Sequence, residues 1–129
     1  MNSNIKLFSV EEANALLPTV RLLVERVQRA HKSILPFGAA AREAAARAEL
    51  GGGGMPGGAS YVTAVMQLAA RTSEVQALGV QIKDYARGLI DFPSLRDGRV
   101  VLLCWQLGEP EEIVWWHETD AGFAGRQPL

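Results

Sequence analysis

Two long stretches of the chain space their apolar residues three or four positions apart, and this spacing constrains the fold most. In the first stretch the series is Leu16, Val20, Leu23, Val27, Ala30 and Ile34, and in the second it is Val65, Leu68, Thr72, Val75, Gly79, Ile82, Ala86 and Leu89. This period places the side chains along one stripe of an α-helix. Two helices with matching stripes are expected to pack as an antiparallel hairpin.

The predicted helical hairpin covers residues 9–88. It begins at a capping-box pattern, in which the side chains of Ser9 and Glu12 each bond the backbone N–H of the other. Ser60 is expected to cap the second helix, and Gly88 is a suitable residue for its end.

A glycine-rich segment, residues 51–58, separates the two predicted helices. Glycine-rich sequences behave as flexible linkers, so a flexible loop is expected here. A phosphate-binding P-loop needs a preceding strand and a Gly-Lys-Ser/Thr ending, and the segment has neither.

The pattern changes after Pro93, where apolar residues become continuous. Residues 99–107 follow the turn pair Asp97 and Gly98, which predicts a buried strand. Residues 112–118 are predicted to return as its antiparallel partner.

Together these patterns predict an α+β fold in a single domain, residues 1–129. A long antiparallel α-helical hairpin is followed by a C-terminal β-hairpin and its tail, residues 89–129, with two or three antiparallel strands. A chain of 129 residues has the usual length of one domain and can bury a core without disulfides.

The strand pairing can be predicted from the turn between the strands. If Leu107 lies opposite Glu112, alternation puts Cys104 and His117 on one face as diagonal neighbours, about 7–8 Å apart at Cα. Both faces of this hairpin are largely apolar, and the helices can cover only one of them. Because large exposed apolar patches are uncommon on monomers, self-association as a homodimer is expected.

Charge and cysteine content exclude some partners. The net charge is −1 and the arginines are interleaved with acidic residues, so no nucleic-acid partner is expected. One cysteine allows no intramolecular disulfide, which suits a reducing compartment. With no signal-peptide pattern and no long apolar run, the expectation is a cytoplasmic protein with no membrane partner.

His117 and Cys104 are the candidate metal ligands, with Glu118 as the third. A thiolate and an imidazole suit zinc or a similar divalent transition metal as cofactor. Asp120, Asp91 or Glu109 could supply a carboxylate instead. The spacing matches no standard metal motif, so the alternative is that the cysteine is a small buried hydrophobe and the histidine a hydrogen-bonded core residue.

Asp91, Glu109 and Arg126 are the candidate ligand-binding residues of a polar pocket beside the β-hairpin. The planar guanidinium of Arg126 suits a carboxylate or a phosphate. Its alternative role is to hold the tail in place by pairing with Asp91 or Glu109. Asp91 could instead cap a turn, and Glu109 could belong to a solvated loop.

Five segments resemble a family of small bacterial and archaeal proteins that is catalogued only as a domain of unknown function (family 2203). They are residues 8–18 (FSVEEANALLP), 88–93 (GLIDFP), 103–109 (LCWQLGE), 116–118 (WHE) and 122–128 (GFAGRQP). The resemblance covers nearly the whole chain. It implies no activity and no ligand, but it implies that six residues belong to motifs: Asp91, Cys104, Trp105, Glu109, His117 and Arg126.

Three functions are consistent with these patterns. The first is a small binding protein with a polar pocket for a metal or a small anion. The second is an oligomeric structural or interaction module with no ligand site. The third is a metal- or thiol-dependent enzyme, for which the sequence shows no complete set of nucleophile, base and oxyanion donors.

Overall fold

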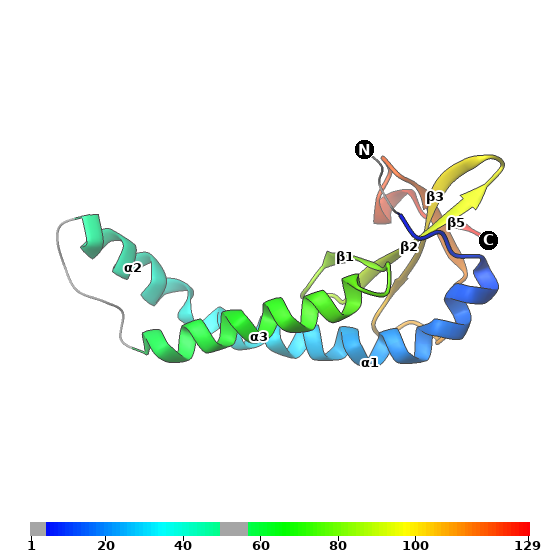
Figure 1. The fold of residues 1–129 in the computed structure, drawn as a ribbon. Helices are drawn as coiled ribbons and strands as arrows, with labels where there is room; N and C mark the ends of the chain where they lie inside the picture. Colours follow the sequence, from blue (N-terminus) through cyan, green and yellow to red (C-terminus); the bar gives the residue numbers. More distant parts are fainter. Residues whose placement is uncertain (1–4, 50–56) are drawn as a thin grey trace.

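A computed structural model describes residues 5–49 and 57–129 and shows an α+β fold (Figure 1). The helices are α1 (Val10–Ile34), α2 (Gly38–Glu49) and α3 (Gly58–Gln76), with short 3₁₀ turns η1 (Leu35–Phe37) and η2 (Phe123–Gly125). The strands are β1 (Gln81–Asp84), β2 (Leu89–Arg96), β3 (Arg99–Gln106), β4 (Trp115–Glu118) and β5 (Gln127–Pro128). They form one antiparallel sheet in the order β1-β2-β3-β4-β5. The predicted fold class is confirmed, but the prediction of two or three strands was too low.

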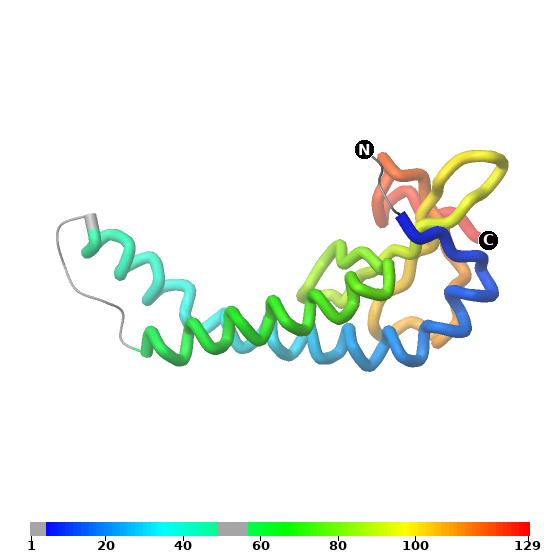
Figure 2. The backbone as a smooth tube through the Cα atoms, viewed as in Figure 1, coloured from blue at the N-terminus to red at the C-terminus, as the bar shows by residue number. Residues whose placement is uncertain are grey.

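Helix α1 begins at the predicted capping box. Ser9 Oγ accepts from the Glu12 N–H at 3.0 Å, and Glu12 Oε1 accepts from the Ser9 N–H at 2.8 Å. The helix continues through Pro18, and Figure 2 shows its first turns, in blue, inclined to the rest. Pro18 cannot bond the carbonyl of Asn14 four residues earlier. The side chain of Asn14 accepts from the Ile113 N–H at 2.7 Å, which attaches the connection between β3 and β4 to α1.

Helix α3 lies beside α1 and runs in the opposite direction (Figures 1 and 2). The fully buried residues of α1 are Ala13, Leu17, Val20, Val24 and Val27. Only Val20 and Val27 belong to the predicted stripe, whereas Leu16 and Leu23 lie partly buried at its margin. The stripe differs because α1 packs against the sheet as well as against α3, so its buried face is not a simple two-helix seam.

The start of α3 differs from the prediction. Gly57, at φ +73°, is the N-cap residue, and no side chain caps the helix. Ser60 therefore lies inside the first turn and is not the cap. Residues 51–56 of the predicted flexible loop lie outside the described residues.

The end of α3 also differs, because the predicted hairpin extended to residue 88. The helix ends at Gln76 and β1 follows. Gly79 adopts φ +90°, and a Cβ there would lie 2.9 Å from the Cβ of Lys6, so the chain turns at a position that favours glycine. Gly88, at φ +63°, lies in the turn between β1 and β2 and does not end a helix.

The predicted register of the hairpin is confirmed where the strands pair. Cys104 lies opposite Trp115 and Leu102 lies opposite His117, as the assumed pairing requires. The strand β4 is shorter than predicted, because pairing begins only at Trp115. Ile113 therefore departs from the alternation and joins the hydrophobic core, and Val114 is exposed.

The two faces of the sheet are both buried, but by different parts of the chain. The core face packs against α1 and α3 through residues that include Ile90, Phe92, Val101, Leu103, Trp105 and Trp116. The second face carries Leu102, Cys104 and His117, which are buried within this single chain. Val100, which alternation puts on this same face, stays exposed, so the homodimer remains a prediction. Among the described residues, no helix is long and apolar enough to cross a membrane.

The tail, residues 119–129, is the segment that lies against this second face. The Arg126 guanidinium carbon lies 4.8 Å from the ring centroid of Trp115 and 4.5 Å from that of Phe123. β5 then pairs with β4 at the edge of the sheet. The chain thus returns over its own β4 and encloses the side chains that lie between the tail and the sheet.

Candidate metal centre

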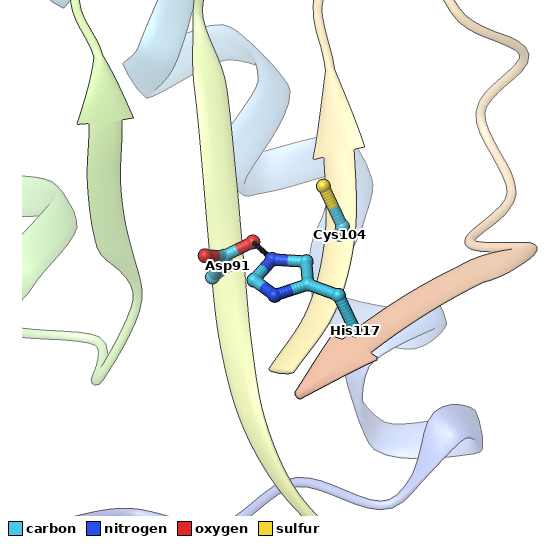
Figure 3. A group of neighbouring side chains, drawn as sticks. All are labelled: Asp91, Cys104 and His117. Atoms are coloured by element: carbon cyan, nitrogen blue, oxygen red, sulfur yellow. Dashed lines mark hydrogen bonds and ion pairs between the residues drawn. The ribbon is translucent and has the colours of Figure 1, made fainter. Parts of the chain in front are cut away.

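Three neighbouring strands bring Asp91, Cys104 and His117 together on the second face of the sheet. Asp91 of β2 pairs directly with Cys104 of β3, and His117 of β4 lies diagonal to Cys104 because it pairs with Leu102. Figure 3 shows the imidazole of His117 reaching across β3 toward Asp91. One potential ligand atom from each side chain lies within 4.8 Å of the other two. We call these three residues the donor group.

The backbone determines which nitrogen of His117 faces the group. Nδ1 lies 2.7 Å from the carbonyl oxygen of Glu118, and because that oxygen can only accept, Nδ1 must carry a proton. Nε2 lies 3.1 Å from Asp91 Oδ1. In the neutral ring Nε2 has a lone pair, so a proton or a metal ion must lie between it and the carboxylate. A ligating histidine usually donates its other N–H to a carbonyl or a carboxylate, as His117 does here.

Asp91 is a buried carboxylate that is only half satisfied. Its side chain is 1% exposed, and Oδ2 has no hydrogen-bond partner in the described part of the chain. Burial raises the pKa of Asp91, although the neighbouring His117 and, to a smaller extent, Lys83 oppose this rise. A buried carboxylate without full compensation is costly, so a positive charge beside it would stabilise the folded protein.

Cys104 is buried and protonated at neutral pH in the ligand-free protein. Burial, followed by the negative charge of Asp91, raises the pKa of the Cys104 thiol to about 12. The nucleophilic form of cysteine is the thiolate, which is therefore rare in this state. A metal ion would change this, because a coordinating thiol loses its proton.

Glu118 lies outside the donor group. Its Oε1 accepts from Arg99 Nε at 3.0 Å, and Oε2 pairs with Arg99 Nη2. The hydrogen bond to Arg99 lowers the pKa of Glu118. Glu118 follows His117 directly in the strand, so alternation turns its side chain to the opposite face. The carboxylate in the donor group is that of Asp91, and not that of Glu118 as predicted from the sequence.

Glu109 and Arg126 pair with each other beside the donor group. Arg126 Nη2 lies 2.8 Å from Glu109 Oε2, and Glu109 Oε1 accepts from the Gln106 N–H at 3.0 Å. The charges of both residues act on the Cys104 thiol, Arg126 lowering and Glu109 raising its pKa. The arginine thus attaches the tail to the turn after β3, which is the alternative role considered for it from the sequence.

A pocket of about 130 Å³ adjoins the donor group. Its lining includes Asp91, His117, Lys83, Thr119 and Phe123. Lys83 is the extra residue at a β-bulge in β1, where the register shifts between its two neighbours. The sequence analysis missed this lysine because it assigned residues 81–84 to a helix.

The glycines that flank β1 are a sequence signal for this strand. Gly79 and Gly88 enclose a segment of only eight residues, which is too short for a stable helix and long enough for a short strand. The apolar residues Val80 and Ile82 within it alternate with polar ones, as in a half-buried strand. Read in this way, the segment would have been predicted as a strand that carries Lys83.

Comparison with known families supports the resemblance seen in the sequence. A family model described as "Uncharacterized conserved protein (DUF2203)" matches residues 6–129. Comparisons with curated proteins and with solved structures gave no match. This family description names no activity and no ligand for the donor group.

Proposed function

The chain belongs to the DUF2203 family of uncharacterized conserved proteins, and we propose that it is a binding protein that holds one transition-metal ion between Asp91, Cys104 and His117. The observation that carries the proposal is that three buried donors of three kinds face one another within 4.8 Å. The hydrogen bonding of the histidine and the unpartnered carboxylate oxygen both favour this interpretation over a purely structural group.

The spacing of the donors suits a tetrahedral ion after small side-chain movements. Zinc binds oxygen, nitrogen and sulfur at about 2.0–2.3 Å, so tetrahedral ligands lie about 3.3–3.7 Å apart. Nε2 of His117 and Oδ1 of Asp91 are already 3.1 Å apart. The sulfur of Cys104 has to approach by at most about 1 Å, which side-chain rotation can supply.

The charges also support a divalent ion. With the ion bound, the carboxylate of Asp91 and the thiolate of Cys104 would carry two negative charges, and the imidazole of His117 would be neutral. A dication makes the sum zero. Charge neutrality within the buried group removes the desolvation cost that the isolated carboxylate carries.

The test is metal uptake by the full chain purified without a histidine tag and freed of metal by a chelator. We expect one equivalent of Zn²⁺ or Co²⁺ per chain by inductively coupled plasma mass spectrometry. At a free metal concentration about 100 times the Kd, the melting temperature should rise by about 10 °C. Co²⁺ should also produce a thiolate-to-cobalt charge-transfer band, which requires the sulfur of Cys104.

Three conservative variants separate the donor group from other metal-binding residues. Cys104→Ser, His117→Gln and Asp91→Asn should each weaken Co²⁺ binding by about a hundredfold or more. His31→Gln is the matched control, because His31 is the only other histidine in the sequence and lies on α1. Stoichiometry that stays below one with every metal tried, including nickel, iron and manganese, would refute the proposal. Equal binding by the three variants and the wild type would refute it as well.

Self-association is a separate proposal with weaker support. Large apolar side chains remain exposed on the single chain, among them Leu22 and Leu35 near α1 and Val62 and Met66 on α3. These residues favour contacts between two chains along the helices, and not through the sheet face that the tail covers. Sedimentation at high protein concentration tests it: a monomer would exclude a homodimer.

A further inference from the structure

The proposed centre has three protein donors, and this number leaves one position of a tetrahedral ion open. Among the described residues, no fourth histidine, cysteine or acidic side chain joins the donor group. Structural zinc sites are usually closed by four protein ligands, whereas three protein ligands and an open position are typical of sites that bind an external molecule. The direction of the open position therefore decides what the ion could bind.

The open side of the donor group faces the adjoining pocket. Asp91 and His117 both line this pocket, whereas the core face of the sheet is filled by apolar side chains. The pocket therefore offers a molecule a route to an ion held by Asp91 and His117. At about 130 Å³ the pocket is well below the roughly 300–1,000 Å³ of sites for drug-sized ligands, so it suits a molecule of a few atoms.

The charge of the pocket selects the kind of molecule. The ion with its donor group would be neutral, and Lys83 is the only lysine or arginine among the described residues that line the pocket. The charge of Lys83 reaches the donor group, because it acts to lower the pKa of Asp91. Thr119 offers a hydroxyl, and Phe123 contributes an apolar wall. This lining complements one negative charge on a small planar or linear group.

Resting on the proposed metal centre, we infer that the pocket is a binding site for a small monoanion such as a short carboxylate, which takes the open position on the ion with Lys83 as its counter-charge. The bulge in β1 has a role in this site. The register shift between Ile82 and Asp84 places Lys83 out of the regular ladder, at the mouth of the pocket.

The experiment is a titration of the Co²⁺-loaded full chain with sodium formate, followed through the visible d–d bands of the cobalt. Formate should shift these bands saturably and leave the thiolate charge-transfer band in place. Cholate, a steroid carboxylate far larger than the pocket, should give no saturable change. A d–d spectrum unchanged by formate would overturn the inference while leaving the metal proposal intact; failure to bind Co²⁺ at all would refute the proposed function itself.

Variants of Lys83 test the counter-charge. Lys83→Met should weaken formate binding by about tenfold and leave the affinity for Co²⁺ unchanged, because the lysine does not bind the ion. Lys83→Arg should retain most of the formate affinity. Lys6→Met is the matched control, since Lys6 lies outside this pocket. Equal formate affinity in Lys83→Met and wild type would overturn the role of Lys83.

Discussion

The side chains of the donor group respond to burial in different ways. The thiol of Cys104 stays protonated, and the carboxylate of Asp91 faces the ring of His117 with Oδ1, whereas Oδ2 has no hydrogen-bond partner in the described part of the chain. His117 is oriented by a single bond to the carbonyl of Glu118. Of these states, the unpartnered oxygen of Asp91 is the costly one, because a buried polar atom without a hydrogen bond destabilises the folded protein.

The reactivity of the only cysteine is a prediction at the residue scale. With a pKa of about 12, the thiolate fraction of Cys104 at pH 7 is on the order of 10⁻⁵. Because the side chain is also buried, the metal-free native protein should react with iodoacetamide far more slowly than the unfolded protein. Mass spectrometry of alkylated samples with and without denaturant checks this. Rapid labelling of the native protein would show that the sulfur is accessible.

Arg126 allows a second prediction at this scale. Its guanidinium pairs with Glu109 and lies against two aromatic rings, and its side chain is 8% exposed. Arg126→Ala should lower the free energy of unfolding by about 2–3 kcal/mol in urea titrations, because it leaves Glu109 without its partner. Arg126→Lys should restore little, since an ammonium cannot stack in the same way. Full stability of the lysine variant would show that charge alone suffices.

The sequence predicted which residues belong to the donor group better than it predicted what each of them does there. Cys104 and His117 were placed on one face because strand alternation depends only on register, and the register followed from a short turn. Asp91 was only one of several possible carboxylates, because residues 89–96 lay between the predicted helix and the predicted strands and were not recognised as a strand. Glu118 was chosen through proximity in sequence to His117, although adjacent residues in a strand point to opposite faces.

At the scale of elements, the start of α1 gives a prediction about acid. Ser9→Ala removes a capping bond and should lower the free energy of unfolding by about 1 kcal/mol near neutral pH. The Ser9 N–H lowers the pKa of Glu12 below its ordinary value of 4.5. The capping contribution of Glu12 is therefore fully present above that value and is lost as the pH falls through the lower, folded pKa.

Chemical denaturation across this pH range measures the acid effect. Glu12→Gln should be less stable than wild type at neutral pH, and the difference should disappear on acidification. Glu11→Gln is the matched control in the same turn, because Glu11 takes no part in the capping box. A stability difference between Glu12→Gln and wild type that does not depend on pH would contradict the assignment.

Elements that carry their own local signals were predictable, and those defined by tertiary context were not. The start of α1, the turn at Asp97 and Gly98 and the register of β3 with β4 all follow from a few adjacent residues. The strand β1 was missed because apolar residues and glycines from 79 to 89 also fit the helical spacing. The brief β5 has no apolar pattern of its own and exists because β4 offers an unpaired edge.

Stability is expected to vary strongly across the whole molecule. The sheet and the adjoining parts of α1 and α3 share one core, whereas no side chain of residues 38–48 in α2 is buried. A helix of twelve residues whose described side chains all stay at least partly exposed is marginal in water. We expect amides of α2 to show opening free energies of about 1–2 kcal/mol and those of β3 to approach the global value.

Hydrogen exchange followed by NMR measures this contrast residue by residue. Amides of α1 that pack against the sheet provide the reference within the same sample, because they share the helical geometry of α2 but are buried. Protection in α2 equal to that of the reference would show that α2 packs on a further surface, such as a second chain.

The covering of the donor group by the tail has a consequence for how the centre could be filled. Loosening of residues 119–129 would widen the access to the donors, so weakening the pair between Arg126 and Glu109 should speed the exchange of a bound ion.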